Sequence, residues 1–252
     1  MSNINTSIVP ALITSALNAY AQYDIRIPRE VPVFLSTVSP LIQTCLDNII
    51  QTFCKKDLSR VECTRLGISY SVAVDGINEK TKAGAKLRSD TFFKGDEYST
   101  ASQLLEAAIK ATIDDSETIK SACYGRFIAN IPFDSSCDEI TLQSLNTIIK
   151  QLTYKELCLI RLLYEKKRFS SSSMEAHLRN TDDIEGTVLF NQLLHLKQLG
   201  ILISMPPFVL GLAIGNVRIS TVGILLHEMM ELDLIPEDDL TNLSSTMSKV
   251  GL

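Results

Sequence analysis

The chain has 252 residues, of which 45% are apolar, and its formal net charge is −5. This length suits one large domain or two small ones, and the apolar fraction is sufficient for a buried core, so the composition indicates a globular protein. No region is polybasic in the way that nucleic-acid-binding modules usually are.

The cysteines predict reduced, buried thiols. There are six of them, at wide and irregular spacings without a Cys-x-x-Cys pair, and several fall on apolar helix faces. This pattern does not suit a zinc site or a disulfide framework, so we expect a cytoplasmic protein. The N-terminus lacks the basic region of a signal peptide, and the uncharged window 198–217 contains two prolines and several glycines, which does not suit a membrane span.

Residues 1–151 are expected to form an all-α bundle, because their apolar residues recur at helical spacing and no convincing strand is present. Ser39-Pro40 predicts an N-cap followed by proline at the first helical position, and Pro132 is expected to end a later helix. The six helices expected here span about 6–23, 39–53, 57 or 59 to 86, 99–113, 115 or 116 to 131, and 139–152.

Residues 152–232 are expected to form a second, smaller domain. Thr153 and Glu156 have the spacing of a capping box and predict a helix that ends near 166–168. A short second helix is expected over 174–178. A third begins at 181–183, buries Leu189, Leu193 and Leu196, and ends at Gly200.

Two short apolar runs, 201–205 and 217–219, predict strands on either side of a loop, and Ser220 or Thr221 caps a last helix over 222–232. Three helices, a hairpin and a helix are the elements of a winged helix-turn-helix. The expected fold class is therefore mainly α, with an N-terminal helical bundle (1–151), a winged-helix domain with a short β-hairpin (152–232) and an acidic C-terminal tail (233–252).

The sequence offers few residues for catalysis. It has three histidines and no tryptophan, and it contains neither a phosphate-binding glycine loop nor a G-x-S-x-G or H-E-x-x-H motif. We interpret His227-Glu228 as a surface pair, because a second histidine one turn on is absent. Cys158 lies beside an apolar helix face, which does not suit a nucleophile. We therefore expect no enzyme, no catalytic residue, no metal and no cofactor.

The third helix is the place to look for DNA recognition, because this helix of a winged helix enters the major groove. Its side away from the leucines carries Asn191, His195 and Gln198, which are able to hydrogen-bond to bases. Its start is acidic and its one cation is Lys197, whereas phosphate neutralisation supplies most non-specific affinity. The sequence therefore favours a non-catalytic interaction or regulatory subunit that uses the winged helix for protein–protein contact. A winged-helix DNA-binding transcriptional regulator is the alternative.

The loop between the two strands, 205–214, is far more apolar than a solvent-exposed wing should be. Phe208, Val209, Leu210 and Leu212 are therefore candidate partner-binding residues. The loop either folds against the N-terminal bundle or is covered by a partner or a second copy of the chain, and transient membrane contact is the remaining alternative. We expect a protein partner or a homo-oligomer, with nucleic acid less favoured and no membrane partner.

Four apolar motifs resemble those of a known family. The segments are 126–131 (RFIANI), 152–157 (LTYKEL), 196–201 (LKQLGI) and 222–226 (VGILL). Together, over about 99–240, they resemble helical bacterial proteins of the abortive-infection alpha type, which are associated with phage defence. The motifs carry no catalytic residue. The resemblance implies an accessory or effector role in bacterial defence.

Overall fold

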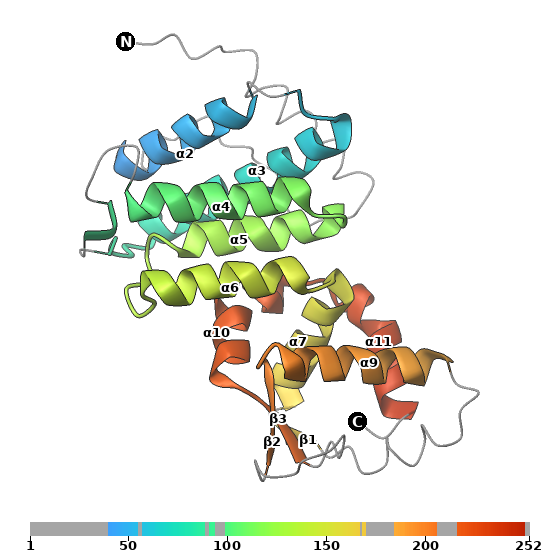
Figure 1. Cartoon of the computed structure of the whole chain (residues 1–252). Coiled ribbons are helices and arrows are strands. Elements are labelled where there is room, and N and C mark those ends of the chain that lie inside the picture. The colour runs from blue at the N-terminus through green and yellow to red at the C-terminus, as the bar shows by residue number, and fades with distance from the viewer. Residues whose placement is uncertain are drawn as a thin grey trace. The chain divides into compact units, whose positions relative to one another are not determined.

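The computed structural model describes residues 40–54, 57–88, 91–93, 99–166, 168–169, 184–205 and 216–249. The chain divides into two compact units, 1–151 and 152–252, each of which buries apolar side chains of its own. The described part is mainly helical with one small antiparallel sheet, as the sequence predicts (Figure 1). No described helix has the length and apolar character needed to cross a membrane.

The described secondary-structure elements of unit 1 are all helices. Its α-helices are α2 (Pro40–Cys54), α3 (Arg60–Lys82), α4 (Thr100–Asp114), α5 (Ser121–Asn130) and α6 (Glu139–Gln151), and its 3-10 helices are η1 (Thr91–Phe93) and η2 (Thr118–Lys120). Helix α4 contacts α2, α3, α5 and α6 and so lies at the centre of the unit (Figure 1). The helix expected over 6–23 lies outside the described residues.

Local sequence sets where these helices begin. The Ser59 hydroxyl accepts from the amide of Glu62, and the Glu62 carboxylate accepts from the amide of Ser59, which makes a complete capping box for α3. Ser99 caps α4 through its hydroxyl, which accepts from the amide of Ser102. Helix α5 begins later than expected, at Ser121, because η2 occupies 118–120.

Helices α3 and α5 pack closely together, and their contact depends on glycine. A Cβ atom on Gly125 would lie 2.6 Å from the Ser69 carbonyl oxygen and 2.7 Å from the Val72 Cβ. A Cβ on Gly76 would lie 2.8 Å from the Ala129 Cβ. The absent side chains therefore allow the two backbones to approach, and the middle of α3, 66–78, is almost wholly buried.

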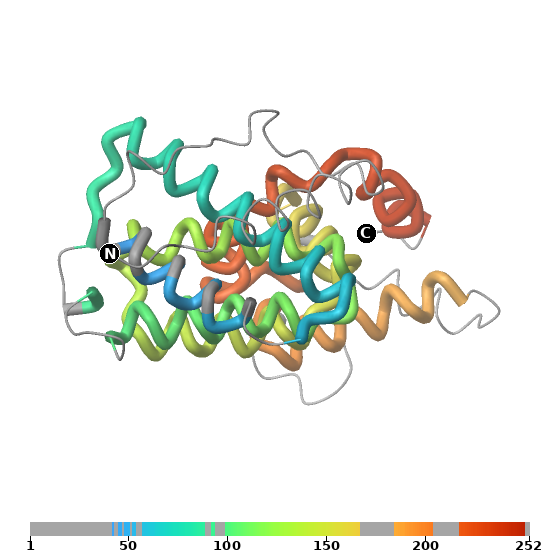
Figure 2. Tube along the Cα trace, turned by 90° about the horizontal axis from the view of Figure 1, so that it is seen from above, coloured from blue at the N-terminus to red at the C-terminus, as the bar shows by residue number. Residues whose placement is uncertain are grey.

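Unit 2 combines helices with the sheet. Its elements are α7 (Tyr154–Lys166), β1 (Arg168–Phe169), α9 (Ile184–Gln198), β2 (Leu202–Met205), β3 (Asn216–Ile219), α10 (Thr221–Met229), η3 (Leu232–Leu234) and α11 (Glu237–Lys249). The tube in Figure 2 follows the same elements from above. The expected capping box at the start of α7 is present, because the amide of Thr153 donates to Glu156 Oε2 at 2.8 Å and Thr153 Oγ1 accepts from the amide of Glu156.

The sheet has the order β1-β3-β2, and both pairings are antiparallel. Strands β2 and β3 are the two that the sequence predicts. Strand β1 was missed, because its two residues lie where the basic end of α7 was expected. Val217 and Ile219 are buried, whereas Arg218 between them is exposed, so one face of β3 contributes to the core.

Two expectations about the C-terminal part were wrong. Helix α10 ends at Met229 rather than 232, because Glu231 has a left-handed backbone with φ of 47° and cannot continue a helix. The described part of the expected acidic tail, 233–249, is not separate from the domain. Helix α11 contacts α7 and α9, and its Leu240, Leu243 and Met247 are buried, so this segment is part of unit 2.

Candidate functional site

Helix α9 presents two opposite sides. Leu189, Leu193 and Leu196 point into the core of unit 2, as predicted. The other side is solvent-exposed and follows a spacing of four, three and seven residues, which keeps its members on one face of a helix. We call these four exposed residues the α9 stripe: Ile184, Val188, Asn191 and Gln198.

The α9 stripe is apolar at its start and polar at its end. The exposed fraction is 79% for Ile184 and 42% for Val188, while Asn191 and Gln198 are exposed amides. The prediction that Asn191 and Gln198 face outward is therefore confirmed. The two aliphatic members were not predicted. Ile184 and Val188 lie seven and three residues before Asn191, which places them on the same side of the helix, so the sequence contained the signal.

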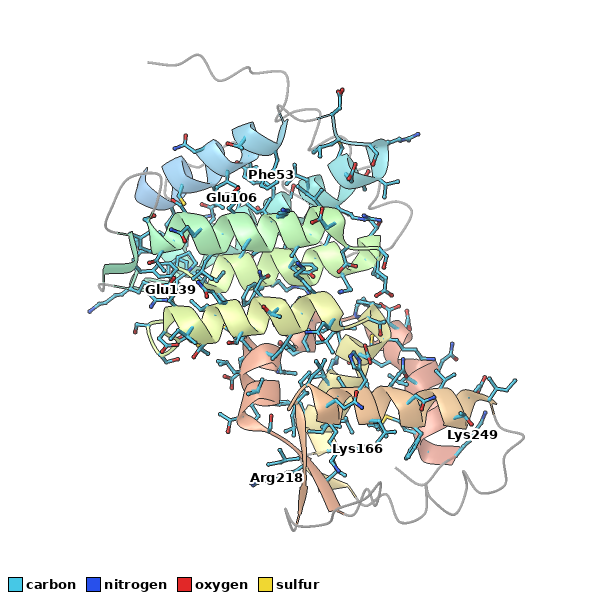
Figure 3. All side chains as sticks on the ribbon, in the orientation of Figure 1. Phe53, Glu106, Glu139, Lys166, Arg218 and Lys249 are labelled. Carbon is cyan, nitrogen blue, oxygen red and sulfur yellow. The ribbon has the colours of Figure 1, made fainter. Side chains whose placement is uncertain are left out.

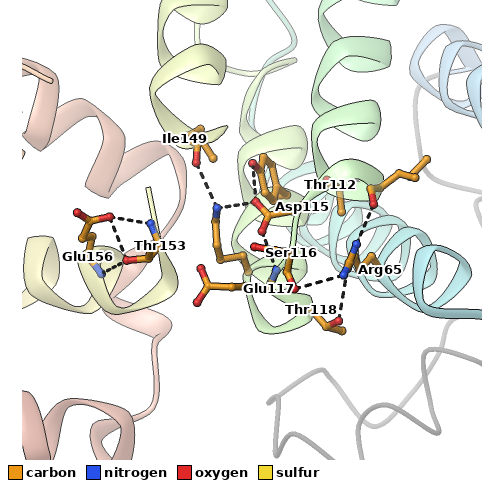
Figure 4. A network of polar contacts seen from close by, with 12 residues as sticks. Arg65, Thr112, Asp115, Ser116, Glu117, Thr118, Ile149, Thr153 and Glu156 are labelled. Carbon is orange, nitrogen blue, oxygen red and sulfur yellow. Dashed lines mark hydrogen bonds and ion pairs between the residues drawn. The ribbon is translucent and has the colours of Figure 1, made fainter. Parts of the chain in front are cut away.

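His195 has the same helical phase as the stripe, but its side chain has a partner inside the unit. Its Nδ1 lies 2.7 Å from Oε1 of Glu156 on α7, and the side chain is 34% exposed. The Glu156 carboxylate is 4% exposed and also accepts from the amide and hydroxyl of Thr153 (Figure 4). This contact with a buried carboxyl group fixes the position of the imidazole ring beside α7. Of the three residues of the expected recognition face, Asn191 and Gln198 are exposed, whereas His195 contacts Glu156 within the unit.

Charge near the α9 stripe is sparse. The charged residues of α9 are Glu185 and Lys197. Lys249 of α11 approaches Glu185 at 3.9 Å, but both side chains are more than 60% exposed, so this ion pair adds little stability (Figure 3). The remaining expected site residues, Phe208, Val209, Leu210 and Leu212, lie outside the described residues, as does the second helix expected over 174–178.

His227 is not the surface residue that the sequence suggested. Its side chain is 6% exposed, and its ring stacks on that of Tyr164 with centroids 3.9 Å apart and planes 9° from parallel. Burial lowers the pKa of His227. Only Glu228 of the expected surface pair is exposed. Sequence reasoning missed this because the ring that covers His227 belongs to a helix 63 positions away.

Arg161 is also a buried polar side chain. The sequence analysis did not identify it. It is 7% exposed, and its guanidinium donates to the Ile235 carbonyl and to the Glu237 carboxylate, with Glu165 Oε1 3.3 Å from its Nε. These contacts join α7 to the segment that leads into α11. The sequence did contain a signal for its burial, because Arg161 lies on an otherwise apolar face of its helix.

Unit 1 contains a buried polar network of its own (Figure 4). The Lys120 ammonium, in a residue only 1% exposed, lies 2.5 Å from Asp115 Oδ2 and 3.4 Å from the Ile149 carbonyl oxygen. The Tyr124 hydroxyl donates to the same carboxylate at 3.2 Å. Burial raises the pKa of Tyr124. These contacts connect the end of α4, η2, α5 and α6.

The described cysteines do not have the environment of activated thiols. Cys158 is 2% exposed, in agreement with its expected place by an apolar face. Burial, together with the hydrogen bond from its thiol to Asp134, raises the pKa of Cys137 to about 11, and burial also raises the pKa of Cys123. Protonated thiols are poor nucleophiles and poor metal ligands. Among the described residues, no three His, Cys, Asp or Glu side chains are grouped closely enough to hold a metal ion.

Comparison with protein-family models, with curated proteins and with solved structures finds no match to this chain.

Proposed function

We propose that this chain is a non-catalytic interaction or regulatory subunit, and that residues 152–232 are a winged-helix domain used for protein–protein contact. The chain order α7, β1, α9, β2, β3 and the sheet order β1-β3-β2 support the winged-helix assignment. In this assignment α9 is the recognition helix and β2 and β3 flank the wing.

The observation that carries the proposal is the chemistry of the α9 stripe. Among the described residues of α9, six are exposed: the stripe itself, Thr187 and Glu185, of which Glu185 alone is charged. A recognition helix that reads DNA works against the phosphate charge and gains most of its affinity from cations. The centres of protein–protein interfaces are instead depleted of charged residues and rich in apolar area. The stripe therefore fits a protein surface better than a DNA groove.

We also propose that the protein acts as an accessory component of a bacterial anti-phage defence system. The support is the resemblance over 99–240. Several of the residues that carry it, including Phe127, Leu157, Leu196 and Leu226, are buried in the core of their unit. They favour a shared fold and carry no site chemistry, so the defence role needs a test of its own. In a bacterial host, expression of the chain should lower phage plaque counts, and the double variant Val188→Glu/Asn191→Lys should restore them.

Site-specific photocrosslinking tests the contact surface directly. A photoreactive phenylalanine analogue at position 191 is expected to give a discrete protein adduct in cells, and the adduct should disappear when Val188→Glu is added. The same analogue at exposed Glu228 of α10 serves as the matched control and should give no such adduct. Adducts only with nucleic acid at position 191 would contradict the proposal.

A DNA-binding regulator is the second candidate, and the sheet favours it. The β1–β3 register places Arg168 opposite Arg218, Arg218 is exposed, and Lys166 is exposed at the end of α7 (Figure 3). Fluorescence anisotropy with a random DNA duplex at low salt separates the candidates. We expect no binding; affinity that falls steeply with salt and is lost in Arg218→Glu would favour the regulator.

A further inference from the structure

The segment 232–249 of unit 2, which holds η3 and α11, is packed against three helices of the same unit. Helix η3 contacts α7 and α10, and α11 contacts α7 and α9. The side of α11 that is turned inward carries three buried side chains: Leu240, Leu243 and Met247. An amphipathic helix of this pattern is therefore the ligand of an apolar site on α7 and α9.

Polar contacts with α7 make this site specific for the beginning of α11. The guanidinium of buried Arg161 donates to the Ile235 carbonyl and to the Glu237 carboxylate. The Tyr154 hydroxyl donates to Asp239 Oδ2 at 2.6 Å. Tyr154 and Arg161 are seven residues apart and so lie on one side of α7. That side therefore recognises the acidic first turn of α11 through hydrogen bonds that involve charged groups.

The connection between α10 and this segment passes through a strained residue. Glu231 has φ of 47° and ψ of 54°, which is the left-handed conformation. Residues with a Cβ atom rarely adopt it, because the Cβ comes too close to the following carbonyl oxygen. Among the described residues, Glu231 is the only one other than glycine with a positive φ. The turn that brings the segment back onto its own α7 is therefore strained, and an extended backbone at 231 would relieve the strain.

We propose that the segment 232–249 is exchanged between two copies of this chain, so that η3 and α11 of each copy occupy the site on α7 and α9 of the other. The contacts of Arg161, Tyr154 and the buried apolar side chains are the same whichever copy supplies α11. Relief of the strain at Glu231 favours the dimer, whereas the loss of translational freedom opposes it. The α9 stripe is not part of the exchanged segment, so the proposal does not rest on the function proposed above.

Cross-linking tests which copy supplies α11. Lys249 of α11 approaches Glu185 of α9 at 3.9 Å, and both side chains are more than 60% exposed. A chain with Glu185→Cys and a longer, tagged chain with Lys249→Cys are unfolded together in urea, refolded at high concentration and mildly oxidised. We expect a disulfide-linked heterodimer on a non-reducing gel.

The matched control replaces the first chain by one with Glu228→Cys, because Glu228 is also exposed but lies on α10. With the same tagged Lys249→Cys chain, it should give several-fold less of the linked heterodimer. Equal yields in the two mixtures would mean that exposed thiols react by random collision, and no heterodimer in either would mean that α11 stays on its own chain. Either result would overturn the proposal.

Substitution of Glu231 tests the strained connection, with sedimentation equilibrium of the refolded full chain as the measurement. Glycine adopts the left-handed conformation without strain, so Glu231→Gly should favour the closed monomer and raise the dissociation constant of the dimer by roughly tenfold or more. Glu231→Asn is a second variant that tolerates this conformation, in case the first does not fold. Glu231→Gln keeps the Cβ, controls for the lost charge and should resemble the wild type. A wild-type chain that remains monomeric, or a dissociation constant that neither Gly nor Asn raises, contradicts the exchange.

Discussion

Asp75 shows how a single buried charge sets a pH dependence. It lies in the enclosed middle of α3 and is 7% exposed. Burial, reinforced by the like charge of Glu79 one turn away, raises the pKa of Asp75 from 3.8 to about 6, and Lys82 offsets this only in part. The folded chain therefore holds this proton to a higher pH than the unfolded chain does. Its stabilising contribution is fully present below about pH 4 and is lost as the pH rises through 6.

Asp75→Asn should make unit 1 more stable at pH 8, by about 1 to 3 kcal/mol, because the amide does not require a buried carboxylate to ionise. At pH 4 the variant and the wild type should be alike. Urea unfolding at the two pH values measures the difference. A variant that is no more stable at pH 8 would show that the carboxylate is well solvated.

At the scale of elements, unit 1 depends on the approach of α3 and α5. Gly125→Ala should destabilise it by about 1 to 3 kcal/mol, since the new methyl group meets the Ser69 carbonyl and Val72, and this exceeds the gain in helix propensity. The measurement is the urea midpoint. Glu106→Ala on the exposed side of α4 is the control and should change stability by less than about 0.5 kcal/mol. An unchanged midpoint in Gly125→Ala would mean that the helices separate easily.

The ion pair of Lys120 and Asp115 connects the elements that follow α4. Lys120→Met should cost about 3 to 5 kcal/mol, because it leaves a buried carboxylate without its cation. The double variant Asp115→Asn/Lys120→Met should recover part of this loss, since it removes both charges. Calorimetric unfolding of the single and double variants measures the coupling. Additive losses would show that the two side chains act separately.

At the scale of the whole molecule, the division into two units predicts that 152–252 folds as a fragment, because these residues bury a core of their own. The fragment should show a helical circular dichroism spectrum and cooperative unfolding. Leu193→Ala should lower its stability by about 2 to 5 kcal/mol, because Leu193 is only 2% exposed at the centre of the inward side of α9. A fragment without cooperative unfolding would show that the second unit does not fold alone.

The sequence by itself determined where most of the described helices begin and which side of α9 is buried. Capping by Ser59, Ser99, Thr153 and Ser220 involves residues within three positions of one another, so short sequence patterns contain the whole interaction. The periodicity of Leu189, Leu193 and Leu196 likewise gives the inward side of α9 without knowledge of what covers it. The outward placement of Asn191 and Gln198 follows from the same periodicity.

Only the tertiary structure decided which polar side chains are buried and what they contact. Glu156 and His195 are 39 residues apart, and Arg161 and Glu237 are 76 apart. The burial of His227 depends on a ring from α7, and the place of α11 depends on apolar surfaces of α7 and α9. Strand β1 has two residues and is a strand because β3 pairs with it. Such contacts are absent from local patterns because the free energy that selects them comes from partners far away in the chain.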